Sequence, residues 1–190
     1  KVLKEGVVRD YPLTIKHKDG KLMEVLYNAS VYKDSRGDVL GVFAAARDVT
    51  EQKQASQYAR SLIESSLDPL VTISPDGKIT DVNEATINAT GATREELIGS
   101  VFSDYFTEPQ KAEAGYKEVL DKGSVQDYGL TIKHKDGKLM DVLYNASVYK
   151  DENEKPIGVF AAAREISQSE LKSARAREFM RSSSEMIYKV

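Results

Sequence analysis

The chain of 190 residues repeats its own sequence at a distance of 117 residues. Residues 10–47 read DYPLTIKHKDGKLMEVLYNASVYKDSRGDVLGVFAAAR, and residues 127–164 match them without a gap at 30 of 38 positions. The match continues more weakly on both sides, where Gly6 corresponds to Gly123. Solenoid repeats have periods of about 20 to 50 residues, so a period of this length indicates copies of a whole domain.

Because the chain is longer than one period, it contains one complete unit and parts of two others. We expect three regions: the C-terminal part of one unit (1–50), a complete domain with its N-terminal linker helix (51–167), and a linker helix with the first strand of a further unit (168–190). The whole then resembles a section of a longer tandem array. A single domain with two similar halves is the alternative, but near-identity at a constant offset argues against it.

The composition narrows the chemistry that this chain can perform. Lys and Arg number 27 and Asp and Glu number 30, so the charges nearly cancel, whereas nucleic-acid-binding surfaces carry a basic excess. The absence of Cys excludes disulfides, thiolate metal sites and a thiol nucleophile, and two His are too few for a polyhistidine metal site. No apolar run approaches the roughly 20 residues that span a bilayer. We therefore expect no metal, no nucleic-acid partner, no membrane contact and a cytoplasmic location.

The hydrophobic pattern of the complete unit predicts an α+β domain. A polar helix is expected at 51–67, followed by a hairpin of two short strands. Asn83 is a suitable N-cap for the next helix, and Thr93 with Glu96 forms a capping box for another. The expected elements are strands at 70–74 and 79–82, helices at 84–88, 93–98 and 108–122, and strands at 125–133, 138–150 and 156–166. Two strands, three helices and a three-strand meander predict one antiparallel sheet with helices packed on it.

Four motifs follow one another in this unit. They are DVNEA at 81–85, GATREELIG at 91–99, Lys-Asp-Gly at 135–137 and Arg-Glu-Ile-Ser at 164–167, which reads Arg-Asp-Val-Thr at 47–50. In this order they resemble the PAS family of sensor modules, and the resemblance spans 55–167. It implies a PAS-like five-stranded antiparallel sheet with helices over one face that enclose a pocket. It also implies a non-enzymatic role in sensing, dimerisation and signal relay, with any output domain, such as a histidine kinase or a diguanylate cyclase, outside this sequence.

A ligand pocket in such a domain needs small residues that leave room and polar groups that point inward. Three successive alanines at 161–163 either open a cavity or let a helix pack closely from outside. The strand 138–150 alternates two partly apolar faces. The face with Asn145 and Ser147 is the better pocket candidate, unless these side chains simply bond to backbone groups. The candidate pocket residues are Asn83, Ile87, Tyr105, Phe106, Tyr116, Leu143, Asn145, Ser147, Phe160 and Ala162.

The PAS resemblance allows the cofactors of that family to be tested against the residues. Light-sensing members form a flavin adduct on a Cys, which this chain lacks. A non-covalent flavin finds no glycine-rich phosphate loop. A haem needs an axial ligand such as His, but His17 and His134 both lie in predicted hairpin turns, where a solvated side chain is the ordinary outcome. We predict no cofactor, which leaves a small ligand or a filled core as the two alternatives.

The junctions between the sheet and the linker helices are the predicted signal-relay sites. Arg164 follows an apolar strand, and a partly buried arginine there needs a carboxylate partner. Its candidate partners are Glu165, Asp81 and Glu84, and a surface pair that contributes little to stability is the alternative. The linker helices 49–64 and 166–181 either pack on their own domain or also pair with a partner chain and relay a shift. The relay candidates are Arg164, Glu165, Ile166, Ser167, Arg47, Asp48, Val49 and Thr50.

The incomplete first unit predicts contacts between chains. Its strands, 8–48, would expose a sheet edge and an apolar face, which favours aggregation unless they are covered. We expect them to pair with another molecule or another part of the chain, with strand 186–190 of a neighbour as the natural donor. The expected partners are therefore a second copy, in a homodimer or strand-exchanged oligomer, and neighbouring PAS repeats. A ligand-free structural spacer is the alternative to a sensory module.

Overall fold

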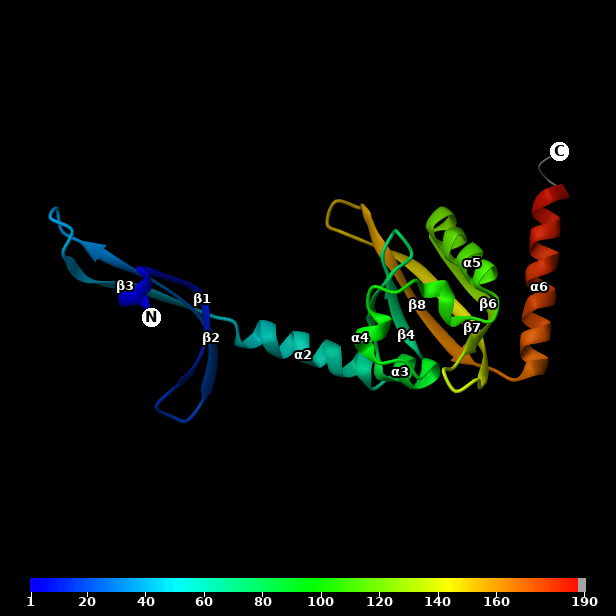
Figure 1. Ribbon diagram of the computed structural model, residues 1–190, viewed down its shortest axis with the longest axis horizontal. Helices are drawn as coiled ribbons and strands as arrows, with labels where there is room; N and C mark the ends of the chain where they lie inside the picture. Colours follow the sequence, from blue (N-terminus) through cyan, green and yellow to red (C-terminus); the bar gives the residue numbers. More distant parts are fainter. Residues whose placement is uncertain (188–190) are drawn as a thin grey trace. The chain divides into compact units, whose positions relative to one another are not determined.

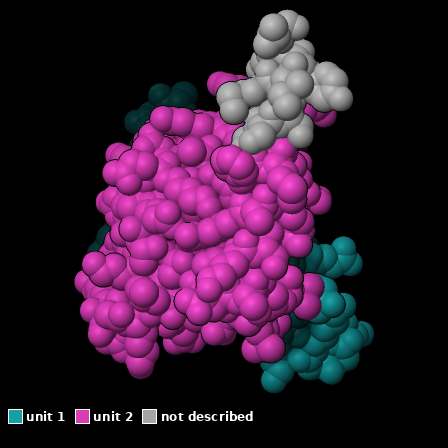
Figure 2. Space-filling model, turned by 90° about the vertical axis from the view of Figure 1, so that its right-hand side faces the viewer, with its two compact units in different colours: residues 1–61 teal, residues 62–190 magenta. Residues whose placement is uncertain are grey.

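The computed structural model describes the backbone of residues 1–187 and the side chains of residues 1–181. The chain divides into two compact units, unit 1 at Lys1–Ser61 and unit 2 at Leu62–Val190 (Figure 2). The boundary falls inside the helix α2 (Thr50–Glu64), in which no residue is buried. Unit 2 contains the complete repeat without most of its linker helix, and unit 1 contains the equivalent of its last three strands.

Unit 2 is built on one five-stranded antiparallel sheet. Its strands are β4 (Leu70–Ile73), β5 (Ile79–Val82), β6 (Ser124–Lys133), β7 (Leu139–Lys150) and β8 (Pro156–Glu165). Their order across the sheet is β5-β4-β8-β7-β6, so the first and last strands in sequence, β4 and β8, are neighbours. The expected antiparallel sheet is confirmed, and every strand end lies within one residue of its predicted position.

Helices cover one face of this sheet, which we call the inner face (Figure 1). They are α3 (Glu84–Thr90), α4 (Arg94–Leu97), the 3-10 helix η1 (Phe102–Tyr105) and α5 (Pro109–Lys122). Leu97 and Val119 belong to one apolar core together with Tyr144 of β7. The sequence predicts η1 only as an aromatic group, because a single turn has no periodicity to detect.

The helix ends follow the predicted caps. The Asn83 side chain accepts a hydrogen bond of 3.0 Å from the backbone N–H of Thr86, which begins α3. Thr93 and Glu96 form the expected capping box, in which the Glu96 carboxylate accepts the Thr93 N–H at 2.8 Å. Gly91 closes α3 in the left-handed conformation with a φ of 68°, which glycine adopts at little cost. These local signals explain why α3 and α4 are two short helices rather than one.

The opposite face of the sheet, the outer face, carries α6 (Gln168–Ile187). Leu171 and Ala174 of this helix are buried, and the helix contacts β6 and β7. The close approach depends on Gly129, because a Cβ at that position would lie 2.9 Å from the Leu171 Cδ1. Residues 186 and 187 of the predicted strand 186–190 belong to α6, and 188–190 lie outside the described residues.

Unit 1 holds a three-stranded sheet in the order β1-β2-β3. Its elements are α1 (Val2–Glu5), β1 (Val7–Lys16), β2 (Leu22–Lys33) and β3 (Val39–Asp48). The strands pair in the same register as β6, β7 and β8 of unit 2. Both sheets contain the same bulge, where Asp10 and Asp127 take φ values of 45° and 54°. The repeat in the sequence is therefore a repeat in structure.

Candidate functional site

A small cavity lies in the core of unit 2, between the inner face of the sheet and the helices. Its volume is about 30 Å³. This is the space of about one water molecule, whereas pockets for drug-sized ligands measure about 300–1,000 Å³. Its walls are Pro69, Val71, Ile79, Thr86, Thr90, Leu97, Phe102, Tyr105, Phe106, Ile132, Tyr144 and Ala161 to Ala163. The core of this domain is therefore nearly filled.

Tyr144 is the polar group that this cavity leaves without a partner. Its side chain is 1% exposed, and its ring lies 5.6 Å from that of Phe102 between ring centres. In the described part of the chain, its buried hydroxyl has no hydrogen-bond partner. Burial raises the pKa of Tyr144 well above the usual value of a tyrosine, so the hydroxyl is neutral at physiological pH. An unpaired buried hydroxyl costs folding free energy of about 1–3 kcal/mol.

The predicted pocket residues divide between the two faces of the sheet. Tyr105, Phe106 and Ala162 line the cavity, and Ile87 and Tyr116 belong to the core around it. The alanine run of β8 contributes to the cavity wall, which is the first of its two predicted alternatives.

The prediction that the Asn145 face of β7 lines the pocket is wrong. Leu143, Asn145 and Ser147 lie on the outer face with Phe160, because strand residues alternate and Tyr144 faces the core. Asn145 accepts the backbone N–H of Asp127 at 2.9 Å and so holds the β6 bulge. This is the predicted alternative in which Asn145 bonds to a backbone group. Thr86 and Thr90 line the cavity instead, and periodicity alone gives no signal for them.

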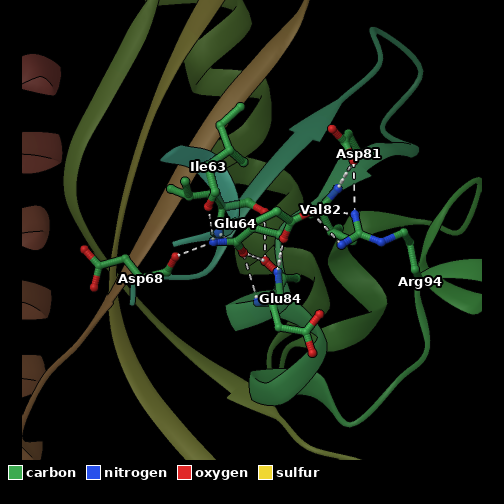
Figure 3. A network of polar contacts seen from close by, with 10 residues as sticks. Ile63, Glu64, Asp68, Asp81, Val82, Glu84 and Arg94 are labelled. Atoms are coloured by element: carbon green, nitrogen blue, oxygen red, sulfur yellow. Dashed lines mark hydrogen bonds and ion pairs between the residues drawn. The ribbon is translucent and has the colours of Figure 1, made fainter. Parts of the chain in front are cut away.

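A second polar site lies where the linker helix α2 ends, and Figure 3 shows Ile63, Glu64 and Arg94 in it. Asn83 makes most of its contacts. Its side chain is fully buried. The amide nitrogen donates to the carbonyls of Ile63 and Asp68 at 3.2 and 3.0 Å, and the amide oxygen accepts the Leu70 N–H at 2.9 Å. Asn83 thus joins the last turn of α2, the start of β4 and the start of α3. We call this group of contacts, with those of Arg94 below, the α2 anchor.

Arg94 of α4 completes the α2 anchor. Its guanidinium lies 2.9 Å from the Glu64 carboxylate and 3.4 Å from that of Asp81, and it also donates to the Val82 carbonyl. The other Glu64 oxygen accepts the backbone N–H of Glu84 at 2.8 Å. The pair is half-buried, and a guanidinium matches such a set of oxygen acceptors better than an ammonium would. This ion pair has no signal in the sequence, because 30 residues separate its members.

Comparison with known proteins identifies the family of this fold. The profile of the family described as PAS domain matches residues 1–51 and 67–168. The chain belongs to the PAS domain family. No sequence among the curated proteins matches it.

Solved PAS structures share the fold. A PAS domain from Colwellia psychrerythraea aligns with a TM-score of 0.53 at 20% identity, covering 60% of this chain and 97% of that chain. A PAS domain from a two-component sensor histidine kinase gives a TM-score of 0.53 at 17% identity, covering 60% and 99%. A light-oxygen-voltage domain studied with a flavin analogue gives 0.53 at 17% identity, covering 69% and 96%. At these identities the likeness establishes the PAS fold.

The predicted relay residues form the junctions between each PAS sheet and its following helix. The Ile166 N–H donates to the Asp141 carbonyl at 2.9 Å, and Val49 makes the equivalent bond to Glu24 at 2.8 Å. The helix caps differ. Ser167 pairs with the Glu170 carboxylate at 2.8 Å and lowers the pKa of that group, whereas Thr50 donates to Asp48 at 2.6 Å. Arg47 and Glu165 are exposed at the strand ends.

Of the two alternatives for Arg164, the buried ion pair is wrong. Arg164 is exposed, because its strand end reaches solvent. Asp81 pairs with Arg94 instead, and the backbone N–H of Glu84 donates to the Glu64 carboxylate.

The two hairpin histidines of the PAS repeats have different surroundings. His17 has 51% of its side chain exposed, as predicted for a turn residue. His134 has 27% exposed, because its ring lies against Gly91, where a Cβ would collide with it. Neither ring is part of the cavity wall.

Among the described side chains, no group of three or more His, Asp or Glu could hold a metal ion. Among the described helices, none is long and apolar enough to cross a membrane.

Proposed function

We propose that this chain is a non-enzymatic sensory relay module of a multidomain signal-transduction protein, and that it transmits displacement between its linker helices. The observation that carries the proposal is the α2 anchor. Asn83 and Arg94 bind the last turn of α2 directly to the PAS domain. A helix held at one defined place can pass a shift or rotation to the domain that holds it.

The following helix, α6, is fastened to the same domain by separate contacts. Lys111 lies 3.1 Å from the Glu178 carboxylate and donates to the Gly129 carbonyl at 2.8 Å. Arg175 pairs with Glu108. Ion pairs near the surface contribute about 1 kcal/mol or less. These ion pairs therefore add little to the docking of α6, which depends mainly on the burial of Leu171 and Ala174 against the outer face.

The nearly filled core supports relay without a large cofactor. A flavin ring system is many times larger than a cavity of about 30 Å³, and the chain has no Cys for a flavin adduct. The cavity therefore does not fit a flavin, although one structural neighbour is a light-oxygen-voltage domain studied with a flavin analogue. The alternative is that the same module binds no ligand and acts only as a structural spacer.

A sensor for a very small polar ligand is the second candidate function. The Tyr144 hydroxyl is buried without a partner beside a cavity that holds about one water molecule. A ligand of that size would satisfy the hydroxyl. The proposal also includes dimerisation, contact with neighbouring PAS repeats and a cytoplasmic location. Its support for these three properties is the sequence repeat and the membership of the PAS family.

Native mass spectrometry and a visible absorption scan of the purified chain test the proposed function. We expect masses that are whole multiples of the 21.1 kDa polypeptide, without any added ligand mass, and no absorption band in the visible range. An added mass or a chromophore that persists through purification would contradict relay by a filled core.

A further inference from the structure

The inner face of unit 1 exposes the same residues that unit 2 buries. The two sheets have the same register, so each residue of β1 to β3 has an exact counterpart in β6 to β8. The exposed fractions are 40% for Leu13 against 1% for Leu130, 43% for Ile15 against 4% for Ile132, and 40% for Val42 against 0% for Val159. In unit 2 the covering segment is 62–123, which we call the front half; 7–50 and 124–167 are the two back halves.

Unit 1 keeps the residues that hold a front half in unit 2. Lys135 donates its backbone N–H to the Thr90 carbonyl at 2.9 Å and its ammonium to Glu96 at 2.6 Å. The Tyr128 hydroxyl donates to the Lys111 carbonyl at 3.1 Å. The counterparts in unit 1 are Lys18 for Lys135, Tyr11 for Tyr128, His17 for His134 and Thr14 for Thr131, all identical.

The free edge of unit 1 is also preserved for pairing. In unit 2, β8 pairs with β4 from Leu70↔Ala162 to Ile73↔Val159, and Ala163 donates its N–H to the Pro69 carbonyl at 3.0 Å. In unit 1, the equivalent strand β3 is the last strand of its sheet. Its residues Val42 to Ala46 are identical to those of β8.

None of the eight differences within the aligned segments falls on a core residue of unit 2. Six lie at 35–40, in the hairpin before β3 and the start of that strand. The other two are Pro12 and Glu24, whose counterparts are Gly129 and Asp141. Gly129 contacts α6, and Asp141 precedes the core residue Val142 in a strand whose side chains alternate, so both belong to the outer face.

We propose that unit 1 is an acceptor surface for a second PAS front half that is supplied from outside residues 1–190. Residues 1–187 contain two back halves and one front half. A second copy that lent its front half would uncover its own unit 2, so exchange between copies covers nothing additional. The occupant is a segment of the chemistry of 62–123, with an apolar strand for β3, a glycine under the His17 ring and a carboxylate for Lys18. This inference concerns a different surface from the proposed relay and stands independently of it.

Hydrogen exchange on an extended chain tests the acceptor surface. A second copy of residues 62–117 is joined ahead of Lys1, which corresponds to position 118, so the repeat continues without a gap. We expect exchange at the Ala46 amide, the counterpart of Ala163, to slow by about tenfold or more relative to the chain without the addition. Exchange at Ala163 should remain unchanged.

A matched control carries Thr72→Pro in the added copy only, because proline at this position disrupts the strand that would pair with β3. We expect the control to leave Ala46 exchange at its original rate. Equal exchange at Ala46 with and without the intact addition would overturn the proposal. So would protection of Ala46 in the chain of 190 residues that disappears on dilution, because a second copy would then be the occupant.

Discussion

The guanidinium of Arg94 lies 2.9 Å from the carboxylate of Glu64, and this contact joins the first residue of α4 to the last residue of α2. Replacement of Arg94 by Met keeps an unbranched apolar stem and removes the ion pairs with Glu64 and Asp81. The pair is half-buried, so we expect a loss of about 1 kcal/mol in the free energy of unfolding. Urea denaturation measures it. Lys135→Met, which removes an exposed ion pair with Glu96, is the control and should cost less.

Asn83 is expected to contribute more to stability than Arg94. Its amide caps α3 and satisfies two backbone carbonyls and one further N–H in a fully buried place. Asn83→Ala removes the cap and leaves these groups unpaired, so we expect a loss of about 3 kcal/mol in denaturation experiments. The exposed Asn88 of the same helix provides the control. Similar losses for Asn83→Ala and Asn88→Ala would contradict the structural role given to Asn83.

The unpaired hydroxyl of Tyr144 predicts a stabilising substitution. Tyr144→Phe removes a buried polar atom without a partner and leaves the ring in place, so we expect the free energy of unfolding to rise by about 1 kcal/mol. Tyr116→Phe is the matched control, because the Tyr116 hydroxyl donates to the Ser74 carbonyl at 2.7 Å and its loss should destabilise. Destabilisation by Tyr144→Phe would show that the hydroxyl has a bound partner, as the small-ligand alternative requires.

Asp136 should titrate far below an ordinary aspartate. The Lys138 backbone N–H and then the Lys138 side chain stabilise its ionised form, which lowers its pKa to about 2. Since the folded pKa lies below the unfolded value near 3.9, the ionised group stabilises the hairpin above about pH 4, and this contribution is lost as the pH falls toward 2. NMR titration of the Asp136 carboxylate measures the midpoint. A midpoint near 3.8 would contradict the hydrogen bonds of this turn.

Gly129 should control the docking of α6. Gly129→Val places methyl groups where the Leu171 side chain already lies within 2.9 Å of a Cβ position, so we expect faster hydrogen exchange in 168–181 and an unchanged core. Pro12 occupies the counterpart of Gly129 in unit 1, and Gln54 the counterpart of Leu171. Pro12→Ala is therefore the control and should change nothing in α6. Unchanged exchange in 168–181 after Gly129→Val would contradict the packing contact.

The helices and strands of this PAS fold could be predicted from local sequence signals, but the long-range contacts between them could not. The caps at Asn83 and Thr93 and the alternation of the strands fix where each element begins and ends, because they depend on neighbouring residues. The inner face of β7 was misassigned, since both of its faces carry apolar residues and only the packing of Tyr144 distinguishes them. Asn145 accepts the backbone N–H of Asp127, which lies in a β-bulge. Asp127 has a positive φ there, and such a conformation at aspartate has no reliable sequence signal.

The candidate site shows the same division. Tyr105 and Phe106 could be placed near the cavity from the fold resemblance, whereas the α2 anchor depends on a side chain that reaches across 30 residues of sequence. The repeat itself was visible from the sequence. Only the structure shows which of the repeated residues form the inner face, and that this face is covered in unit 2 and exposed in unit 1.

Hydrogen exchange of α6 in the Arg94→Met chain tests the relay most directly. We expect faster exchange at 168–174, on the opposite face of the sheet from Arg94, and unchanged exchange at the β7 amides. The Lys135→Met control should leave exchange at 168–174 unchanged. Faster exchange confined to the end of α2, with α6 exchanging as in the unmodified chain, would show that the anchor can break without any effect on the outgoing helix, and would contradict the relay.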